Sequence, residues 1–273
     1  IPCGREVRRN PHPLNDQIDL TQLRCAQYAD LKRAALSLGT LGGGNHFIEV
    51  DKDAEGDFYL VIHSGSRHLG MEVSDFYLRA GQKEQQEKKQ GGHAPYLMTC
   101  LSGELLQDYL HDLALVQEYA AINREAMIEA IVSGMKWKVQ ESYACIHNYV
   151  DFSGEVPILR KGAIRALEGE QVIIPINMRD GSVLARGRGN AEWNYSAPHG
   201  AGRLMSRTAA RQSLDMDAYA EAMKGIYTTS VNASTIDEAP MAYKSIDDII
   251  GVIRDSVDVI DIMKPIYNFK ASD

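Results

Sequence analysis

The sequence contains no run of 18 apolar residues, so a membrane-spanning helix is not expected. Its first residues, Ile-Pro-Cys-Gly-Arg, include neither a basic region nor an apolar stretch, so we do not expect them to be a signal peptide. An initiator methionine is also absent, and this predicts that sequence upstream of Ile1 is missing. No internal repeat, low-complexity tract or Pro/Ser-rich linker divides the chain, so residues 1–273 are expected to form one domain.

Cysteines are few and scattered, and none of them has CxxC spacing: Cys3, Cys25, Cys100 and Cys145. This argues against a zinc ribbon and against a disulfide framework. Unpaired cysteines are typical of a reducing compartment, so we expect the protein to be cytoplasmic.

An excess of basic residues is also lacking, because the net charge is −8. That excludes general affinity for nucleic acid through a uniformly basic surface. The charge is nevertheless uneven: residues 179–211 contain six arginines against Asp180 and Glu192, whereas residues 212–273 contain eleven acids against five bases. A local basic surface on an acidic chain is compatible with a phosphate-bearing ligand.

Hydrophobic periodicity predicts a mixture of helices and strands without strict alternation. Helices are expected at 14–37, at 72–89, over 103–135 as one or two helices, after Gly202, and at 245–263. Strands are expected at 46–50, 58–63, 144–151, 156–160, 171–176 and 182–186. This order favours an α+β fold in which central mixed β-sheets are flanked by helices.

Three histidines occupy strand-like positions beside polar or glycine-rich turns: His46, His63 and His147. Neutral imidazole is the commonest metal ligand, and rigid strands can bring such ligands together. Each could equally be an ordinary core histidine, since spacing alone does not show that the three meet. If they do, nitrogen donors suit Zn, Mn or Fe better than Mg or Ca. The preceding Gly42, Gly43 and Gly44 could approach a phosphate or simply form a tight turn.

A fourth histidine, His199, is surrounded by small residues that leave room for a bulky partner. The glycines that follow precede an expected helix start, where backbone N–H groups suit an anion. Arg203 and Arg207 are one helical turn apart and could face the same phosphate. A histidine in such surroundings can act as a covalent nucleophile. The alternative, a glycine-rich helix start with two solvated arginines, is about as well supported by these residues alone.

Several segments together resemble the successive signatures of the RtcB family of RNA ligases. They occur in the family's order and cover most of the chain: residues 38–49, 63–67, 147–149, 160–163, 199–203 and 237–244. The resemblance implies an RtcB-like catalytic domain over residues 1–273 that lacks its N-terminal portion. It further implies a GTP- and Mn²⁺-dependent ligase that joins RNA 3′-phosphate, or 2′,3′-cyclic phosphate, to 5′-hydroxyl ends in tRNA splicing or RNA repair.

The resemblance also implies roles for individual residues. His199 corresponds to the histidine that attacks GTP and carries GMP, and the family's metal-binding histidines, which hold a pair of Mn²⁺ ions, correspond to His46, His63 and His147. Residues around the nucleotide and the metals correspond to Asn45, Phe47, Glu49, Asn148, Pro175, Met178, Ser182, Ala201, Gly202, Tyr243 and Lys270. Basic residues that would contact phosphates or the RNA end correspond to Arg67, Arg203 and Arg207.

Two departures from the family pattern bear on function. The upstream Asp-Ile-Gly-Cys-Gly signature, whose Asp and Cys are metal ligands in the family, is not found here. Residues 175–180 read Pro-Ile-Asn-Met-Arg-Asp where the family usually has Pro-Gly-Ser-Met-Gly. Two alternatives therefore stay open: a metal-dependent phosphoesterase of RNA ends, and a non-catalytic RNA-end binder. The sequence indicates neither the physiological RNA nor an oligomeric state.

Overall fold

The computed structural model describes residues 1–87 and 95–271, and these form two compact units. Unit 1 comprises Ile1–Gly42 and Ser64–Trp137, and unit 2 comprises Gly43–His63 and Lys138–Asp273. Within the described ranges no helix is long and apolar enough to cross a membrane. The expectation of one catalytic domain over residues 1–273 stays a prediction.

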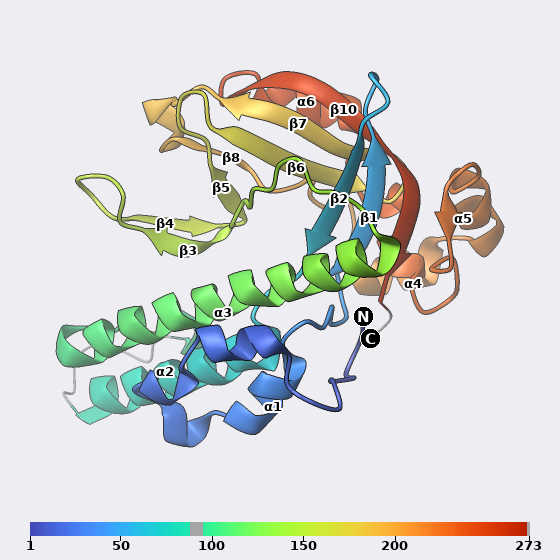
Figure 1. Cartoon of the computed structure of the whole chain (residues 1–273). Coiled ribbons are helices and arrows are strands. Elements are labelled where there is room, and N and C mark those ends of the chain that lie inside the picture. Colours follow the sequence, from blue (N-terminus) through green and yellow to red (C-terminus); the bar gives the residue numbers. More distant parts are fainter. Residues whose placement is uncertain (88–94, 272–273) are drawn as a thin grey trace. The chain divides into compact units, whose positions relative to one another are not determined.

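Unit 1 is built from helices (Figure 1). They are α1 (Leu31–Ser37), α2 (Arg67–Glu87) and α3 (Gly103–Met135), with 3₁₀ turns η1 (Pro13–Gln17), η2 (Leu20–Gln22), η3 (Ala26–Tyr28) and η4 (Tyr96–Met98). The helical stretch expected over 103–135 is confirmed with the same bounds, and of the one or two helices left open it forms one, α3. The helix expected at 72–89 is confirmed as α2, which begins earlier; residues 88 and 89 lie outside the described part of the chain.

The prediction of one helix over 14–37 is wrong, because only its last residues form α1 and the rest form 3₁₀ turns. The backbone N–H groups of Arg24 and Cys25 donate to the Asp112 carboxylate on α3, at 2.7 and 3.1 Å, rather than to carbonyls of their own turn. The Asp19 carboxylate accepts from the Thr21 N–H at 3.0 Å and forms a local turn. Such side-chain acceptors compete with helical hydrogen bonds, and a tertiary acceptor cannot be read from local periodicity.

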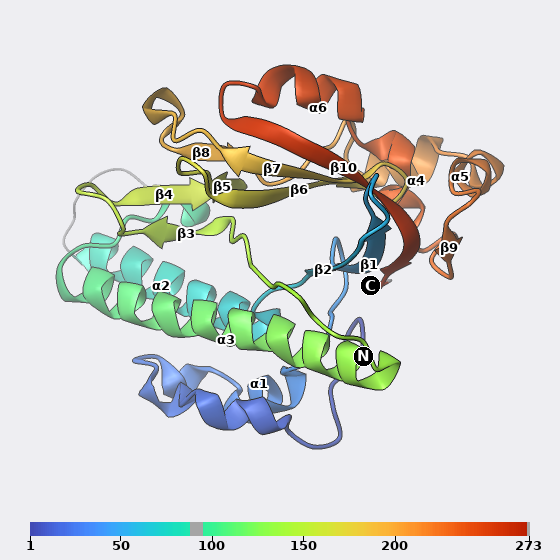
Figure 2. The same cartoon turned by 45° about the horizontal axis from the view of Figure 1, so that its top comes forward.

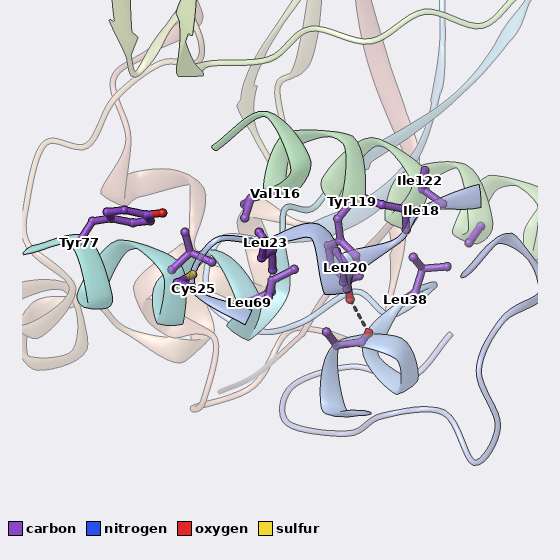
Figure 3. Close-up of a cluster of buried hydrophobic side chains, with 13 residues drawn as sticks. Ile18, Leu20, Leu23, Cys25, Leu38, Leu69, Tyr77, Val116, Tyr119 and Ile122 are labelled. Atoms are coloured by element: carbon purple, nitrogen blue, oxygen red, sulfur yellow. Dashed lines mark hydrogen bonds between the residues drawn. The ribbon is translucent and has the colours of Figure 1, made fainter. Parts of the chain in front are cut away.

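The core of unit 1 packs the 3₁₀ turns and α1 against α2 and α3 (Figure 3). Leu38, Leu69 and Tyr119 are essentially fully buried in it. The Tyr119 hydroxyl donates to the Ala34 carbonyl oxygen at 2.7 Å, so its polar end is satisfied inside the core.

Unit 2 is built around a sheet with strand order β2-β1-β10-β7-β6, in which β9 pairs in parallel with β10 and the other pairs are antiparallel. Two smaller sheets pair β3 with β4 and β5 with β8. The strands are β1 (Phe47–Lys52), β2 (Phe58–His63), β3 (Asn148–Asp151), β4 (Ile158–Lys161), β5 (Ala163–Arg165), β6 (Gln171–Asn177), β7 (Gly181–Gly187), β8 (Ser196–Pro198), β9 (Tyr227–Thr228) and β10 (Val257–Lys270). Five of the six expected strands are confirmed with ends shifted by two residues at most, and the one expected at 144–151 is confirmed only in its second half, as β3. Strands β5, β8 and β9 are too short to show alternation.

The helix expected over 245–263 is only half right. Helix α6 ends at Ile253, and from Val257 the chain forms the long strand β10, which pairs first with β7 and then with β1 (Figure 1). Val257 and Ile260 fit a helical period, but they belong to a stretch rich in β-branched residues. The apolar residues of this stretch fit the two-residue period of a strand as well as they fit the period of a helix. Short apolar runs of this kind are ambiguous by periodicity alone.

Helices flank the sheets of unit 2: α4 (Arg207–Ser213), α5 (Met216–Ala222) and α6 (Ile246–Ile253), with turns η5 (Ala191–Trp193), η6 (Ile236–Glu238) and η7 (Pro240–Ala242). Ile249 and Ile253 of α6 pack against Val172 and Ile174 of β6, so α6 covers one face of the main sheet (Figure 2). The predicted α+β fold, with mixed sheets flanked by helices, is confirmed.

Candidate active site

Each of the four histidines singled out from the sequence lies at the end of a strand of unit 2. His46 immediately precedes β1, and His63 is the last residue of β2. His147 immediately precedes β3, and His199 immediately follows β8. Strand ends are held by the hydrogen bonds of the sheet yet leave their side chains outside it, which suits residues that must converge on a ligand.

The rings of these histidines form a continuous group. The centroids of His46 and His63 are 5.7 Å apart, those of His63 and His147 are 5.4 Å apart, and those of His147 and His199 are 4.6 Å apart. The structure thus brings together the four histidines that sequence spacing alone could not place in contact. We call them the histidine group.

The environment favours the neutral form of two rings of the group, those of His63 and His147. Burial, reinforced by the neighbouring imidazoles, holds the pKa of His63 well below its ordinary value. Burial and the nearby His199 ring lower the pKa of His147 to about 4. Neutral imidazole is the form that binds a metal ion.

One atom of the group is buried without a partner: Nδ1 of His147 has no hydrogen bond among the described residues. A buried polar atom without a partner is costly and suits a site that a ligand completes. In residues 1–87 and 95–271, however, no group of three or more His, Cys, Asp or Glu side chains already has the spacing to hold a metal ion. The imidazole nitrogens of the histidine group therefore fit a transition metal chemically, although the described side chains are not already arranged as a set of metal ligands.

Residues expected near the nucleotide form a second group beside β1 and β10. Phe47 is paired with Lys270 across these strands. The Lys270 ammonium lies 5.7 Å from the centre of the Phe47 ring and 5.8 Å from that of Tyr243. Three of the expected nucleotide residues thus converge, although they are far apart in the sequence.

The centre of this second group is Glu238, a residue to which the sequence assigned no role. Its carboxylate accepts a hydrogen bond from the Tyr243 hydroxyl at 2.6 Å and forms ion pairs with Lys270, Arg203 and Arg207, the last two at 3.1 Å. Glu238 is only 3% exposed, and these neighbours, Lys270 above all, hold the pKa of its carboxyl below the ordinary value against the effect of burial. It belongs to the quoted motif 237–244, but no local pattern shows that one acid meets three cations.

Arg203 and Arg207 do converge, but not as one turn of a helix. The helix expected after Gly202 is confirmed as α4, but it begins only at Arg207, capped by the Ser206 hydroxyl, so Arg203 is not part of it. Arg203 instead forms a β-bridge with Tyr243. Both guanidinium groups reach Glu238, so their phosphate-binding role, which stays a prediction, would require an exchange of partners.

Arg67 belongs to unit 1, where it begins α2 with a φ of +55°. Its guanidinium donates to the Thr40 hydroxyl at 2.9 Å and to the Gly4 carbonyl oxygen at 2.8 Å. These contacts tie the N-terminal segment of unit 1 to α2. Its expected contact with RNA stays a prediction.

The amide side chains expected at the site lie next to the histidine group. Nδ2 of Asn45 is 3.4 Å from Nε2 of His63. Oδ1 of Asn148 accepts from the Gly162 N–H at 3.2 Å. Both amides therefore already contact the segments that carry the rings.

A buried polar cluster lies in the main sheet of unit 2. Glu49 and Asp51, two residues apart on β1, are 2% and 0% exposed. Burial and the charge of Asp51 raise the pKa of Glu49 well above its ordinary value, and burial raises the pKa of Asp51. Asn268 donates to Glu49, yet both Asp51 oxygens, the Ser182 hydroxyl and the Asn268 carbonyl oxygen have no hydrogen-bond partner among the described residues. Glu49 and Ser182 were expected near the nucleotide; Asp51 and Asn268 were not.

The segment 175–180, which departs from the family pattern, forms the end of β6 and the turn into β7. Ile176 and Met178 are buried, and the Tyr219 hydroxyl donates to the Met178 sulfur at 3.2 Å. Arg179 donates to the Asp180 carboxylate at 2.9 Å within the turn. The unusual residues are therefore accommodated by the core and by the turn itself. A nucleotide contact of the Met178 side chain stays a prediction.

Two further expected residues follow His199. The Ala201 N–H donates to the Pro175 carbonyl oxygen at 3.1 Å, and the Gly202 carbonyl oxygen accepts from the Lys244 N–H at 3.1 Å. These bonds fix the chain after the histidine against β6 on one side and the 237–244 motif on the other.

Comparison with known proteins adds an independent finding. A family model described as tRNA-splicing ligase RtcB matches residues 8–271. The RNA-splicing ligase RtcB of Escherichia coli (strain K12) is 37% identical over 249 residues, which cover 85% of this chain and 61% of that protein. The tRNA-splicing ligase RtcB of Aeropyrum pernix is 32% identical over 268 residues, covering 79% of this chain and 55% of that protein. The chain thus spans less than two thirds of the length of these relatives.

Proposed function

Since the chain belongs to the RtcB family, we propose that it is the catalytic part of a GTP-dependent RNA ligase. The ligase would join an RNA 3′-phosphate to a 5′-hydroxyl, in tRNA splicing or RNA repair. The observation that carries the proposal is the histidine group, in which the His199 ring lies against that of His147 and burial favours the neutral form of His147 and His63. A cytoplasmic location remains a prediction, consistent with free Cys3, Cys25, Cys100 and Cys145.

The first step is nucleotide transfer to the protein. The Nε2 lone pair of His199 attacks the α-phosphorus of GTP and forms an N–P bond, while the bond from that phosphorus to the bridging oxygen breaks and pyrophosphate leaves. In this proposal Lys270 and Tyr243 would orient the nucleotide, and Arg203 and Arg207 would exchange Glu238 for the phosphates and offset their charge. Neutral imidazole is required, because a protonated ring has no lone pair to offer.

Two transfers complete the reaction. An oxygen of the RNA 3′-phosphate attacks the same phosphorus, the N–P bond breaks, and the electron pair returns to His199. The 5′-hydroxyl oxygen of the second RNA then attacks the 3′-phosphorus, loses its proton and displaces GMP. A 2′,3′-cyclic phosphate is first opened by water to the 3′-phosphate.

A transition metal, Mn²⁺ by the family resemblance, would be held by His46, His63 and His147. It would supply Lewis-acid neutralisation of phosphate charge near His199. The unpartnered Nδ1 of His147 supports this assignment.

The proposal is tested with two short RNAs, one ending in 3′-phosphate and one beginning with 5′-hydroxyl. The full-length protein with Mn²⁺ and GTP should join them, and omission of GTP should stop joining. A joined product that forms equally without GTP, or RNA phosphate release in its place, would contradict the proposal.

A second candidate is a non-catalytic RNA-end binder. It is favoured by the lack, among the described residues, of a metal-ligand group with ligating spacing. Titration of the full-length protein with Mn²⁺ separates the two candidates, since no saturable binding would favour the binder.

A further inference from the structure

Gly162 connects the two histidines whose rings lie nearest each other. It separates β4 from β5, which pair with β3 and β8 respectively. Its N–H donates to the His147 carbonyl oxygen at 2.8 Å and to the Asn148 amide oxygen at 3.2 Å. Its own carbonyl oxygen lies 2.6 Å from Nδ1 of His199. The backbone of this one residue thus contacts both the segment that carries His147 and the ring of His199.

We propose that Gly162 is a positioning residue that fixes the tautomer and the orientation of the His199 ring. A carbonyl oxygen only accepts hydrogen bonds, so Nδ1 of His199 must carry the proton in this contact. In the neutral ring, the lone pair is then on Nε2. The inference rests on the proposed function, because it concerns the residue assigned there as the nucleophile.

The same bond serves the ring after it has reacted. When Nε2 bonds to phosphorus, the imidazole keeps its Nδ1 proton and gains positive charge. A hydrogen bond from a charged donor is stronger than one from a neutral donor. The Gly162 carbonyl oxygen therefore stabilises the loaded ring more than the unloaded one.

The position requires glycine for two reasons. Its φ is +67°, a left-handed conformation that residues with a Cβ rarely adopt. A Cβ there would lie 3.3 Å from Cε1 and 3.4 Å from Nδ1 of His199. The ring would have to move away from the carbonyl oxygen that holds it.

The experiment compares Gly162→Ala with a matched control, Gly169→Ala. Gly169 also has a left-handed backbone, with a φ of +75°, but nothing lies within 4 Å of a Cβ added there. Both variants therefore have the same kind of backbone cost, and only the first disturbs His199. The readout is the rate at which label from α-phosphate-labelled GTP attaches to the full-length protein.

We expect Gly162→Ala to label several-fold more slowly, because the ring must shift by a fraction of the displacement of about 1 Å that costs roughly 100-fold at a reacting group. Gly169→Ala should label at the wild-type rate. Equal rates in the two variants would overturn the role of Gly162. Failure of the wild-type protein itself to label would instead count against the proposed function.

A spectroscopic readout isolates the tautomer from folding and from activity. The protein is labelled with ¹⁵N at the imidazoles, and His199→Gln identifies the signals of His199 by their loss. At mildly alkaline pH, where ordinary imidazoles are neutral, the His199 proton should be on Nδ1 in the wild-type protein and should redistribute to both nitrogens in Gly162→Ala. A wild-type ring protonated on Nε2 would overturn the inference, and this holds even if Gly162→Ala does not fold.

Discussion

The two units differ in how many of their buried polar side chains have hydrogen-bond partners. In unit 1, Asp112 is fully buried and accepts hydrogen bonds from the Arg24 and Cys25 N–H groups and from the Tyr77 hydroxyl. Asn123, equally buried, accepts from the Gly39 N–H and donates to the Gly65 carbonyl oxygen. These side chains are satisfied by their own unit, so their role is to hold it together.

Unit 2 leaves several such groups without partners. Among the described residues, all but one of the buried side-chain atoms that lack a hydrogen bond belong to it, including Nδ1 of His147, both Asp51 oxygens and the Ser182 hydroxyl. Burial of unpaired polar atoms costs free energy, so a fold that retains them in one unit gives up stability there. Unpaired buried polar atoms of this kind suit a site that a ligand completes, and the histidine group, on which the proposed function rests, lies in unit 2.

The largest effect on stability is expected from Asp112→Ala in unit 1. The change leaves two backbone donors and the Tyr77 hydroxyl buried without an acceptor, which should cost about 3–5 kcal/mol of unfolding free energy. Urea unfolding measures it. The control Asp108→Ala removes an exposed carboxylate 3.8 Å from Arg24 and should change stability by less than about 1 kcal/mol. Equal losses in the two variants would contradict the structural role of Asp112.

In unit 2, His147→Ala should affect ligand binding more than stability. The full-length variant should bind Mn²⁺ at least roughly tenfold more weakly, the lower end of the losses seen when groups that support a metal site are removed. Its unfolding free energy without metal should change little, because Nδ1 of His147 has no partner to lose. Calorimetric titration with Mn²⁺ measures the affinity, and urea unfolding without metal measures the stability. Unchanged Mn²⁺ affinity would contradict the assignment of His147 as a metal ligand of unit 2.

The stability of Asp51→Asn relative to the wild-type protein should increase as the pH rises. Burial raises the folded-state pKa of Asp51, so its contribution to stability is fully present below the pKa of the unfolded chain, near 3.9, and is lost as the pH rises through the folded value. The asparagine variant has no such loss, and its advantage over wild type should grow from acidic to mildly alkaline pH. Unfolding curves across that range provide the test. A constant difference between the two proteins would mean that Asp51 titrates normally.

Asp151 should show the opposite and smallest dependence. Burial favours its neutral form, but hydrogen bonds from Ser153 and the Arg160 guanidinium outweigh this and lower the pKa of Asp151 to about 2. Its contribution is therefore present above about pH 3.9 and lost as the pH falls towards 2. Asp151→Asn should flatten the decline in stability over this acid range. An acid limb as steep as that of the wild type would contradict the depressed pKa.

The features that could be predicted from the sequence are those encoded by patterns of neighbouring residues. The alternation of β1 and β2 and the acidic turn between them identified that hairpin, and the long periodic stretch identified α3 with its observed bounds. Ordered motifs singled out His46, His63, His147 and His199, which the structure brings together.

The unpredictable part depended on contacts between distant residues. Helix 14–37 is interrupted by an acceptor on α3, Asp112, and the Val257 stretch is a strand because β7 and β1 lie beside it. Glu238 and Gly162 acquire their importance from partners more than thirty residues away in the sequence. No local period or turn signal carries that information.

The central claim is that His199 becomes covalently loaded by a guanine nucleotide. The most direct measurement is incubation of the full-length protein with Mn²⁺ and α-phosphate-labelled GTP, followed by denaturing electrophoresis. The control is His68→Ala, which removes a partly exposed histidine paired with Glu72. Acid-labile label should remain on the wild-type protein and on the control and should be lost from His199→Ala. Undiminished labelling of His199→Ala, or no label on the wild-type protein, would contradict the account.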